Sequence, residues 1–385
     1  MIERRFEGLL PPKHHTILRD EAGAVMHEEC ITRDGFEGPY TIVYHQRPPH
    51  TATPTDARHG WSLPASSPQR PLRRRHYKTG GLSDRQGSAL DSRNVMLFND
   101  DVSIATLFPN KHDPAYLSNG DGDDLFFILK GSGLVRTMLG DLPFNAGDYV
   151  AIPRGIVHRF LPDKGIDQHW LAVECAGGLR LPKQWRNEHG QLRMDAPFCH
   201  RDFRTPTLMS PQDEGLRDVV IKRQGRFDTF RFAESPLDIV GWDGSVYPFV
   251  FPIRAFQARV GMVHLPPTWH GTFATRGALI CSFVPRPLDF HPQAIPCPYP
   301  HSSVDCDEVL FYCDGNFTSR RGVAAGSLSH HPAGITHGPH PGAYEESIGA
   351  KFTSELAVML DTTAPLQATA TAVGVEDAAY HDSFR

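Results

Sequence analysis

Long hydrophobic runs are missing from this sequence of 385 residues. No stretch approaches the ~20 apolar residues that a membrane-spanning helix needs, and the first residues lack the apolar core of a secretory signal. An excess of positive charge is missing too, because the formal net charge is −5 at pH 7. We therefore expect neither a membrane nor a nucleic acid as the main partner.

A disulfide framework is also missing. The seven cysteines are odd in number, and none of them forms a Cys-x-x-Cys pair. Free thiols are typical of a reducing compartment, so we expect a cytoplasmic protein.

Helical periodicity is scarce, and we expect only a few short helices, for instance near 211–216. The sequence instead has 34 glycines and 33 prolines, with short runs rich in Val, Ile, Phe and Tyr between them. Examples of such runs are Leu125–Leu129, Val309–Tyr312 and Leu356–Leu360. This pattern predicts a mainly β protein built as a sandwich or barrel.

Three segments look irregular. The Pro-rich stretches within 46–71 predict a long loop, and the basic run 73–78 predicts a solvated loop. The last residues, beginning near Ala364, are rich in Ala and Thr and predict a mobile tail.

An internal repeat indicates the organisation of the chain. In each copy a carboxylate precedes a glycine by seven residues, and a Pro-x-Gly-Ile-x-His unit follows. The first copy has Asp124–Gly131 and Pro153–His158, and the second has Glu308–Gly315 and Pro332–His337. The repeat resembles the two-motif pattern of the cupin family, whose fold is a jelly-roll barrel.

We therefore expect a double cupin with irregular N-terminal and connecting segments. The predicted units are an N-terminal segment over 1–99, a first barrel over 100–185, a connector over 186–254, a second barrel over 255–361 and a tail over 362–385.

The second copy carries a candidate metal site. His301 lies seven residues before Glu308, and His337 ends the repeat. Two imidazoles and one carboxylate are the ligand set of non-haem Fe(II) oxygenases, which leaves positions open for O2 and substrate. In the first copy the position seven before Asp124 is Leu117, which cannot bind metal. We expect that barrel to be metal-free, with His158 in a structural role.

Several neighbours compete for these roles. Asp307 is the alternative carboxylate. His301 and Glu308 would face opposite sides of one regular strand, so a bulge or turn must separate them. His331 either lines the site or supports a ligand, whereas His330 and His340 are expected to face solvent.

A second histidine pair, His264 and His270, precedes the triad, with two rigid prolines between its members. Either imidazole suits a general base, because its ordinary pKa is near neutral.

Longer stretches resemble the homogentisate 1,2-dioxygenase family. They are Leu179–Leu192, Ala196–Phe203, Leu237–Gly244 and the final His-Gly-Pro at 337–339. The resemblance implies a cytoplasmic Fe(II) enzyme of tyrosine and phenylalanine breakdown. Such an enzyme opens the ring of homogentisate, a small aromatic acid, with O2 to give maleylacetoacetate. It also implies a homo-oligomer, either a trimer or a hexamer of trimeric units.

The same resemblance implies roles for individual residues. His301, Glu308 and His337 become the iron ligands, His337 also borders the substrate, and His270, or second His264, becomes the base. His331 matches a family histidine at the substrate pocket. Two positions depart from the family: Phe317 stands where a tyrosine lies near the pocket, and Asp314 stands where a basic residue occurs.

Other functions share parts of this pattern. The alternatives are a dioxygenase of gentisate or another hydroquinone acid, a metal-dependent cupin isomerase or decarboxylase, and a non-catalytic cupin that binds a small molecule. The carboxylate of an aromatic acid needs a cationic partner, and the candidates are Arg286, Arg320 and Arg321.

Overall fold

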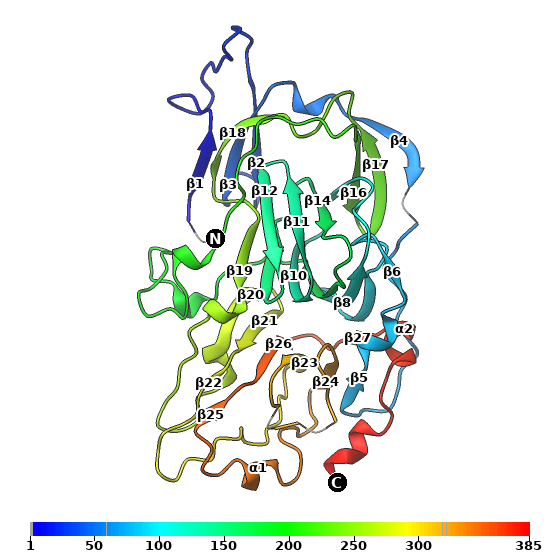
Figure 1. Ribbon diagram of the computed structural model, residues 1–385, viewed down its shortest axis with the longest axis vertical. Coiled ribbons are helices and arrows are strands. Elements are labelled where there is room, and N and C mark those ends of the chain that lie inside the picture. Colours follow the sequence, from blue (N-terminus) through cyan, green and yellow to red (C-terminus); the bar gives the residue numbers. More distant parts are fainter. Residues whose placement is uncertain (1–2, 59, 318, 321) are drawn as a thin grey trace.

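A computed structural model describes residues 3–58, 60–317, 319–320 and 322–385. Strands dominate the described chain and form three large sheets (Figure 1). The helices are short. The two α-helices are α1 (Ala343–Glu346) and α2 (Ala370–Gly374). The 3-10 helices are η1 (Pro49–Thr51), η2 (Thr79–Leu82), η3 (Lys183–Trp185), η4 (His200–Asp202), η5 (Ile253–Ala255), η6 (Pro267–His270) and η7 (Tyr380–Phe384). None of the described helices is long and apolar enough to cross a membrane.

Two of the large sheets enclose the first barrel. One contains, in spatial order, β19 (Phe249–Pro252), β13 (Asp148–Ile152), β10 (Asp123–Lys130), β15 (His169–Cys175), β8 (Val102–Pro109), β7 (Asn94–Phe98) and β27 (Gln367–Ala368), with β6 (Gln86–Gly87) beside β8. The other contains β12 (Gly140–Asn145), β11 (Ser132–Thr137), β14 (His158–Pro162), β9 (Tyr116–Asn119), β16 (Asp218–Arg223), β17 (Arg226–Arg231) and β4 (Thr53–Arg58).

The third large sheet carries the second repeat and lies in the lower half of Figure 1. Its order is β20 (Gly271–Thr275), β21 (Ala278–Phe283), β26 (Leu356–Thr362), β23 (Asp307–Asp314), β24 (Leu328–His331) and β5 (Arg75–Tyr77). Two small sheets complete the fold. They are β1 (Arg5–Gly8), β18 (Ile239–Gly244), β3 (Tyr40–His45) and β2 (His27–Thr32), and the pair β22 (Arg286–Pro287) and β25 (Phe352–Thr353).

The internal repeat of the sequence corresponds to a repeated strand arrangement in the structure. The order β13-β10-β15-β8-β7 matches β24-β23-β26-β21-β20. The register matches as well: Asp124 pairs with Ile152 and Glu174, and Glu308 pairs with His331 and Asp361. The predicted mainly β, double-cupin fold is therefore confirmed, with one jelly-roll unit around β10 and another around β23.

Strand alternation explains how the two units join. Phe126 and Ile128 point into the first barrel, while Leu125 and Phe127 belong to the core shared with the second unit. On β23 the alternation repeats, because Phe311 faces that shared core. The rings of Phe127 and Phe311 meet edge-on with centroids 6.3 Å apart. Leu310 and Tyr312 instead face the interior of the second unit, on the same side as Glu308.

Segments predicted to be irregular contain regular structure. The connector supplies β16 to β19, and the Pro-rich region supplies β4, which is the edge strand of its sheet, pairs with β17 and carries Pro54 near its start. Proline is tolerated there because an edge strand leaves backbone groups unpaired. The stretch 211–216 is not helical.

The basic run is not a solvated loop. Arg75, His76 and Tyr77 form β5, are buried, and pair with β24 beside the predicted metal site. The C-terminal tail is also ordered, because β27 extends the first barrel and η7 packs against the second unit, with Tyr380 only 3% exposed. All seven cysteines are free thiols, as predicted.

Candidate metal centre

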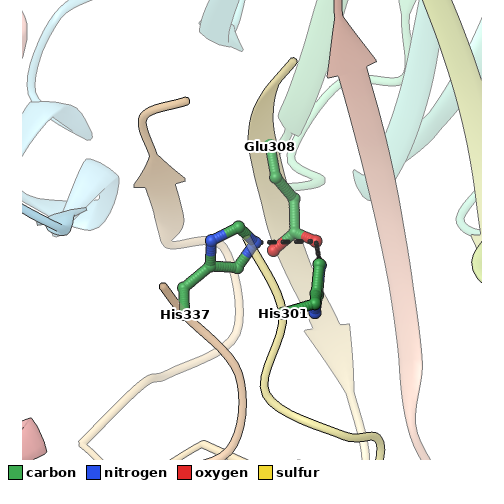
Figure 2. A group of neighbouring side chains, drawn as sticks. All are labelled: His301, Glu308 and His337. Carbon is green, nitrogen blue, oxygen red and sulfur yellow. Dashed lines mark ion pairs between the residues drawn. The ribbon is translucent and has the colours of Figure 1, made fainter. Parts of the chain in front are cut away.

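His301, Glu308 and His337 converge inside the second unit. Glu308 is the second residue of β23, whereas His301 and His337 lie outside the strands and exchange both backbone hydrogen bonds at 2.8 Å. The irregular segment 302–306 separates His301 from β23, so the expected break between the two ligands is present. Figure 2 shows the three side chains pointing toward one another.

The geometry of this group suits a metal ion. His301 Nε2 lies 3.7 Å and His337 Nε2 lies 3.6 Å from Glu308 Oε2. All three candidate ligand atoms lie within 4.8 Å of one another, and within the described residues this is the one group of three or more such side chains found.

Backbone carbonyls fix the two imidazoles in the orientation that ligands require. His337 Nδ1 lies 3.0 Å from the Ile335 carbonyl, and His301 Nδ1 lies 3.3 Å from that of Tyr299. Each Nδ1–H therefore donates to a carbonyl, which leaves Nε2 as the lone-pair atom facing the centre. His337 Nε2 is buried and has no hydrogen-bond partner within the described residues. A buried polar atom without a partner is costly, and a bound cation would satisfy it.

Charge favours a cation at the same point. Burial acts to raise the pKa of Glu308, but the hydrogen bond with His331 and the nearby imidazoles of His301 and His337 together hold that pKa well below its usual range. Glu308 is therefore an ionised carboxylate in a buried site. The nearby Glu308 carboxylate raises the pKa of His301. Across the strand pair, burial and then the charge of Glu308 raise the pKa of Asp361 to about 7.

Asp307 points away from this centre. Its carboxylate lies 2.9 Å from His330 Nε2 and accepts hydrogen bonds from the backbone N–H groups of Ala333 and Leu366, at 2.8 and 2.9 Å. The structure thus brings Glu308, and not Asp307, to the two histidines. The expectation that His330 faces solvent is wrong, because this contact with Asp307 buries it.

His331 lies behind Glu308 and supports it. His331 Nδ1 is 2.7 Å from Glu308 Oε1, and the side chain is fully buried. Burial is the largest influence on the pKa of His331, which falls to about 3, so the ring is neutral. His340 is also buried, contrary to the expectation that it faces solvent. Its Nε2 lies 2.8 Å from Ser383 Oγ, and its ring stacks on Phe384 with centroids 4.0 Å apart.

A pocket opens onto His301 and Glu308 and contains both candidate bases. The side chains of His264 and His270 line it together with His301 and Glu308. His264 is partly exposed, and its Nδ1 lies 3.7 Å from the carboxylate of Asp289. His270 is buried in η6, and burial followed by the charge of Arg286 lowers its pKa to about 3.

Two of the three candidate arginines reach the same pocket. Arg286 and Arg320 both line it. Arg320 Nη2 lies 3.7 Å from Glu308 Oε1, and its Nη1 donates to the carbonyl of Gly338. Arg286 Nη2 lies 3.7 Å from Glu355. Arg321 falls outside the described residues.

Phe317 lies elsewhere. It packs edge-on against Tyr312 with ring centroids 4.9 Å apart and is absent from the residues that line the pocket. Phe317 was predicted to contact the substrate, but it does not line this pocket. Asp289 and Tyr380, by contrast, touch the site residues although no motif marked them in the sequence.

In the first barrel, a guanidinium and an amide bind the carboxylate that matches Glu308. Leu117 pairs with His158 as His301 pairs with His337, so the predicted alignment of the two copies is correct. Arg93 Nη2 lies 3.3 Å from Asp124, and the Asn119 amide donates to the same carboxylate at 2.8 Å. A guanidinium thus lies beside the carboxylate that matches Glu308.

Comparison with known proteins decides the family. A relative from Saccharolobus solfataricus, named "Putative dioxygenase SSO1533", is 32% identical over 378 residues, which is 97% of each chain. The family model described as homogentisate 1,2-dioxygenase N-terminal matches residues 95–253. This chain belongs to the homogentisate 1,2-dioxygenase family.

Other relatives in the homogentisate 1,2-dioxygenase family are more distant. The homogentisate 1,2-dioxygenase of Bradyrhizobium diazoefficiens is 25% identical over 266 residues, which cover 66% of this chain and 58% of that protein. Among solved structures, a cupin 2 conserved barrel domain protein from Leptotrichia buccalis matches 70% of this chain and 89% of its own, at 11% identity and a TM-score of 0.29. The matched range of the family model ends before His301, so the ligand assignment rests on the geometry above.

Proposed function

We propose that the chain is an Fe(II)-dependent dioxygenase that opens the ring of homogentisate with O2 to give maleylacetoacetate. The observation that carries this proposal is the convergence of two imidazole Nε2 atoms and one ionised carboxylate at a pocket that also contains histidine and arginine. His301, Glu308 and His337 would hold the iron. When bound, Fe(II) would lower the pKa of a phenolic hydroxyl and bring O2 and substrate together.

His264 is the better placed of the two candidate bases. Asp289 lies behind its Nδ1, so a proton taken up on Nε2 gives an imidazolium that faces a carboxylate. His270 lacks such support, since its Nδ1 has no hydrogen-bond partner within the described residues and burial lowers its pKa to about 3. We therefore propose that His264 accepts the proton of the phenolic hydroxyl, and that His270 stays neutral and helps to orient the substrate.

Arg286 is the preferred partner for the carboxylate of the substrate. A guanidinium binds a carboxylate with two parallel N–H donors. Arg320 is paired with the candidate ligand Glu308 and with the Gly338 carbonyl, whereas Arg286 pairs with Glu355 and the Val284 carbonyl and contacts no candidate ligand. An aromatic acid bound by Arg286 would lie between this cation and the metal ligands that line the same pocket.

The test is anaerobic reconstitution with Fe(II), followed by oxygen uptake with homogentisate and, separately, with gentisate. We expect one O2 consumed per homogentisate, a ring-opened product identified by mass spectrometry, and no uptake by the H301A and H337A variants. Uptake with gentisate alone would reject the substrate, and full activity of H337A would reject the ligand set. Turnover without O2, or no turnover at all, would favour an isomerase, a decarboxylase or a non-catalytic cupin.

The proposal also includes a cytoplasmic homotrimer or hexamer of trimeric units. Sedimentation equilibrium of the purified chain tests this assembly, and a monomer at micromolar concentration would reject it.

A further inference from the structure

The C-terminal segment packs against the back of the candidate metal centre. Thr369 caps α2 through its side chain, and Glu376, just beyond that helix, pairs with Arg75 at 2.6 Å and with Arg70. Asp377 pairs with Lys78 at 2.9 Å. These ion pairs attach the segment to β5 and to the residues around it. The following helix η7 is thereby held beside β24, which carries His331.

Tyr380 in η7 touches the residue that supports Glu308. Its hydroxyl lies 3.2 Å from His331 Nε2, while His331 Nδ1 lies 2.7 Å from Glu308 Oε1. The two rings are stacked with an interplanar angle of 14°. Both side chains are buried, at 3% and 0% exposure, so water does not compete for these contacts.

The direction of each hydrogen bond follows from the donors available. An ionised carboxylate only accepts, so His331 must donate from Nδ1. A neutral imidazole with its proton on Nδ1 has a lone pair on Nε2, which must accept from Tyr380. Burial raises the pKa of Tyr380, so its hydroxyl keeps the proton that it donates.

We infer that Tyr380 is a positioning residue of the metal centre, whose hydroxyl holds His331 in the tautomer that donates to Glu308. Glu308 Oε1 is then occupied by His331, and Oε2 is turned toward His301 and His337. The inference rests on the proposed function in so far as the centre holds a metal ion.

The same segment also holds the loop after the ligand His337. Ser383 and Phe384 contact His340, three residues beyond that ligand. Arg74 donates from Nη2 to the Thr336 carbonyl at 2.6 Å and lies 4.5 Å from the Phe384 ring centroid. η7 therefore contacts the structure on both sides of the site, which favours a positioning role over a chance contact.

The experiment compares Y380F with Y77F in anaerobic titrations of the metal-free protein with Co(II), followed by its absorption spectrum. Tyr77 is the matched control, because it is fully buried in the neighbouring strand β5 and its hydroxyl has no hydrogen-bond partner within the described residues. We expect Y380F to weaken Co(II) binding about 10- to 100-fold, because removing a hydrogen-bond partner that supports a metal ligand typically has an effect of this size. We expect Y77F to stay within about twofold of the unchanged protein.

A second comparison separates positioning from general stability. In an H331Q background, Y380F should have no further effect on the Kd for Co(II), because Tyr380 acts through the imidazole. An unchanged Kd in Y380F, an equal loss in Y77F, or the same loss in the H331Q background would overturn the inference.

Failure of the proposed function has a different signature. A chain that binds Co(II) but takes up no O2 with homogentisate after loading with Fe(II) would reject the proposed reaction, while the Kd ratios would still decide the role of Tyr380. A chain that binds neither metal would reject the metal centre and this inference together.

Discussion

Asp307 and Glu308 are neighbours in the chain, yet their side chains serve opposite faces of β23. Glu308 faces His301 and His337, whereas Asp307 holds His330 and two backbone N–H groups. A single position in the strand thus separates a candidate ligand from a structural carboxylate.

Separate amide substitutions should distinguish these two carboxylates. E308Q removes the negative charge at the centre, and we expect the protein to lose its metal. D307N keeps the metal but weakens the bond with His330, and we expect it to lower the free energy of unfolding by about 1–3 kcal/mol. Metal content after gel filtration and thermal unfolding of both variants check this. Metal loss in D307N with retention in E308Q would reverse the assignment.

His45 should make stability depend on pH far from the metal centre. Burial acts to lower the pKa of His45, but hydrogen bonds with Asp238 and Glu29 raise it to about 9. A raised pKa in the folded state stabilises the protein fully below the unfolded value of about 6.5, and this contribution is lost as the pH rises toward 9.

The variant H45Q tests that contribution. We expect it to cost about 1–3 kcal/mol at pH 6, where His45 is charged. The cost should be much smaller at pH 9.5, where His45 is neutral. Urea unfolding at the two pH values measures the difference, and an equal cost at both would contradict the argument. Glu29 is half-exposed, so Asp238 is the partner expected to contribute more.

At the scale of elements, β10 and β23 occupy equivalent places but carry different chemistry. Both strands hold a carboxylate in the same register against their neighbours. In the first barrel, Arg93 and Asn119 bind Asp124, and Leu117 replaces the first histidine. Compared with the second unit, this place thus has a cationic side chain beside the carboxylate and lacks one of the three candidate ligands.

This difference predicts that one substitution will not restore a second metal site. L117H supplies the missing imidazole, but the guanidinium of Arg93 still neutralises Asp124. We expect L117H to bind one metal ion per chain, the same number that we expect for the unchanged protein. Elemental analysis of protein saturated with Fe(II) without O2 gives the stoichiometry, and two ions per chain would contradict the role given to Arg93.

The elements predicted from the sequence were those with a repeated motif. The alignment of Leu117 with His301 was correct because both copies keep the same seven-residue spacing to the carboxylate, across an irregular segment that separates the two positions. Edge strands escaped prediction. β5 is a short basic segment whose partner β24 lies about 250 residues away, and no local pattern encodes such a pairing. Tyr380 escaped for the same reason, since its role depends on where η7 packs.

At the scale of the whole molecule, one core joins the two units. Phe311 is fully buried, faces Phe127 across the junction, and meets the ring of His169 at 5.9 Å. Tyr149 on β13 bonds Ser282 on β21 at 2.9 Å, which adds a buried polar contact to the same junction. The two units therefore depend on one another for burial.

F311A should destabilise both units together. Removing a buried phenylalanine costs about 3–5 kcal/mol, and the cavity would open in the core that both units share. We expect one cooperative unfolding transition at lower temperature in calorimetry. Two separate transitions would show that the units fold independently. F317A is a control, because Phe317 lies within the second unit, away from the junction.

The pairing of β5 with β24 sets an order of events during synthesis. The residues of β5 are synthesised long before those of β24. β5 therefore has no pairing partner while the residues of the first barrel are synthesised. Closing so long a loop is slow, because non-local pairing has a large entropic cost before it gains contacts. The sheet that carries Glu308 is thus expected to close late, and the proposed iron would reach its site only after the rest of the molecule has folded.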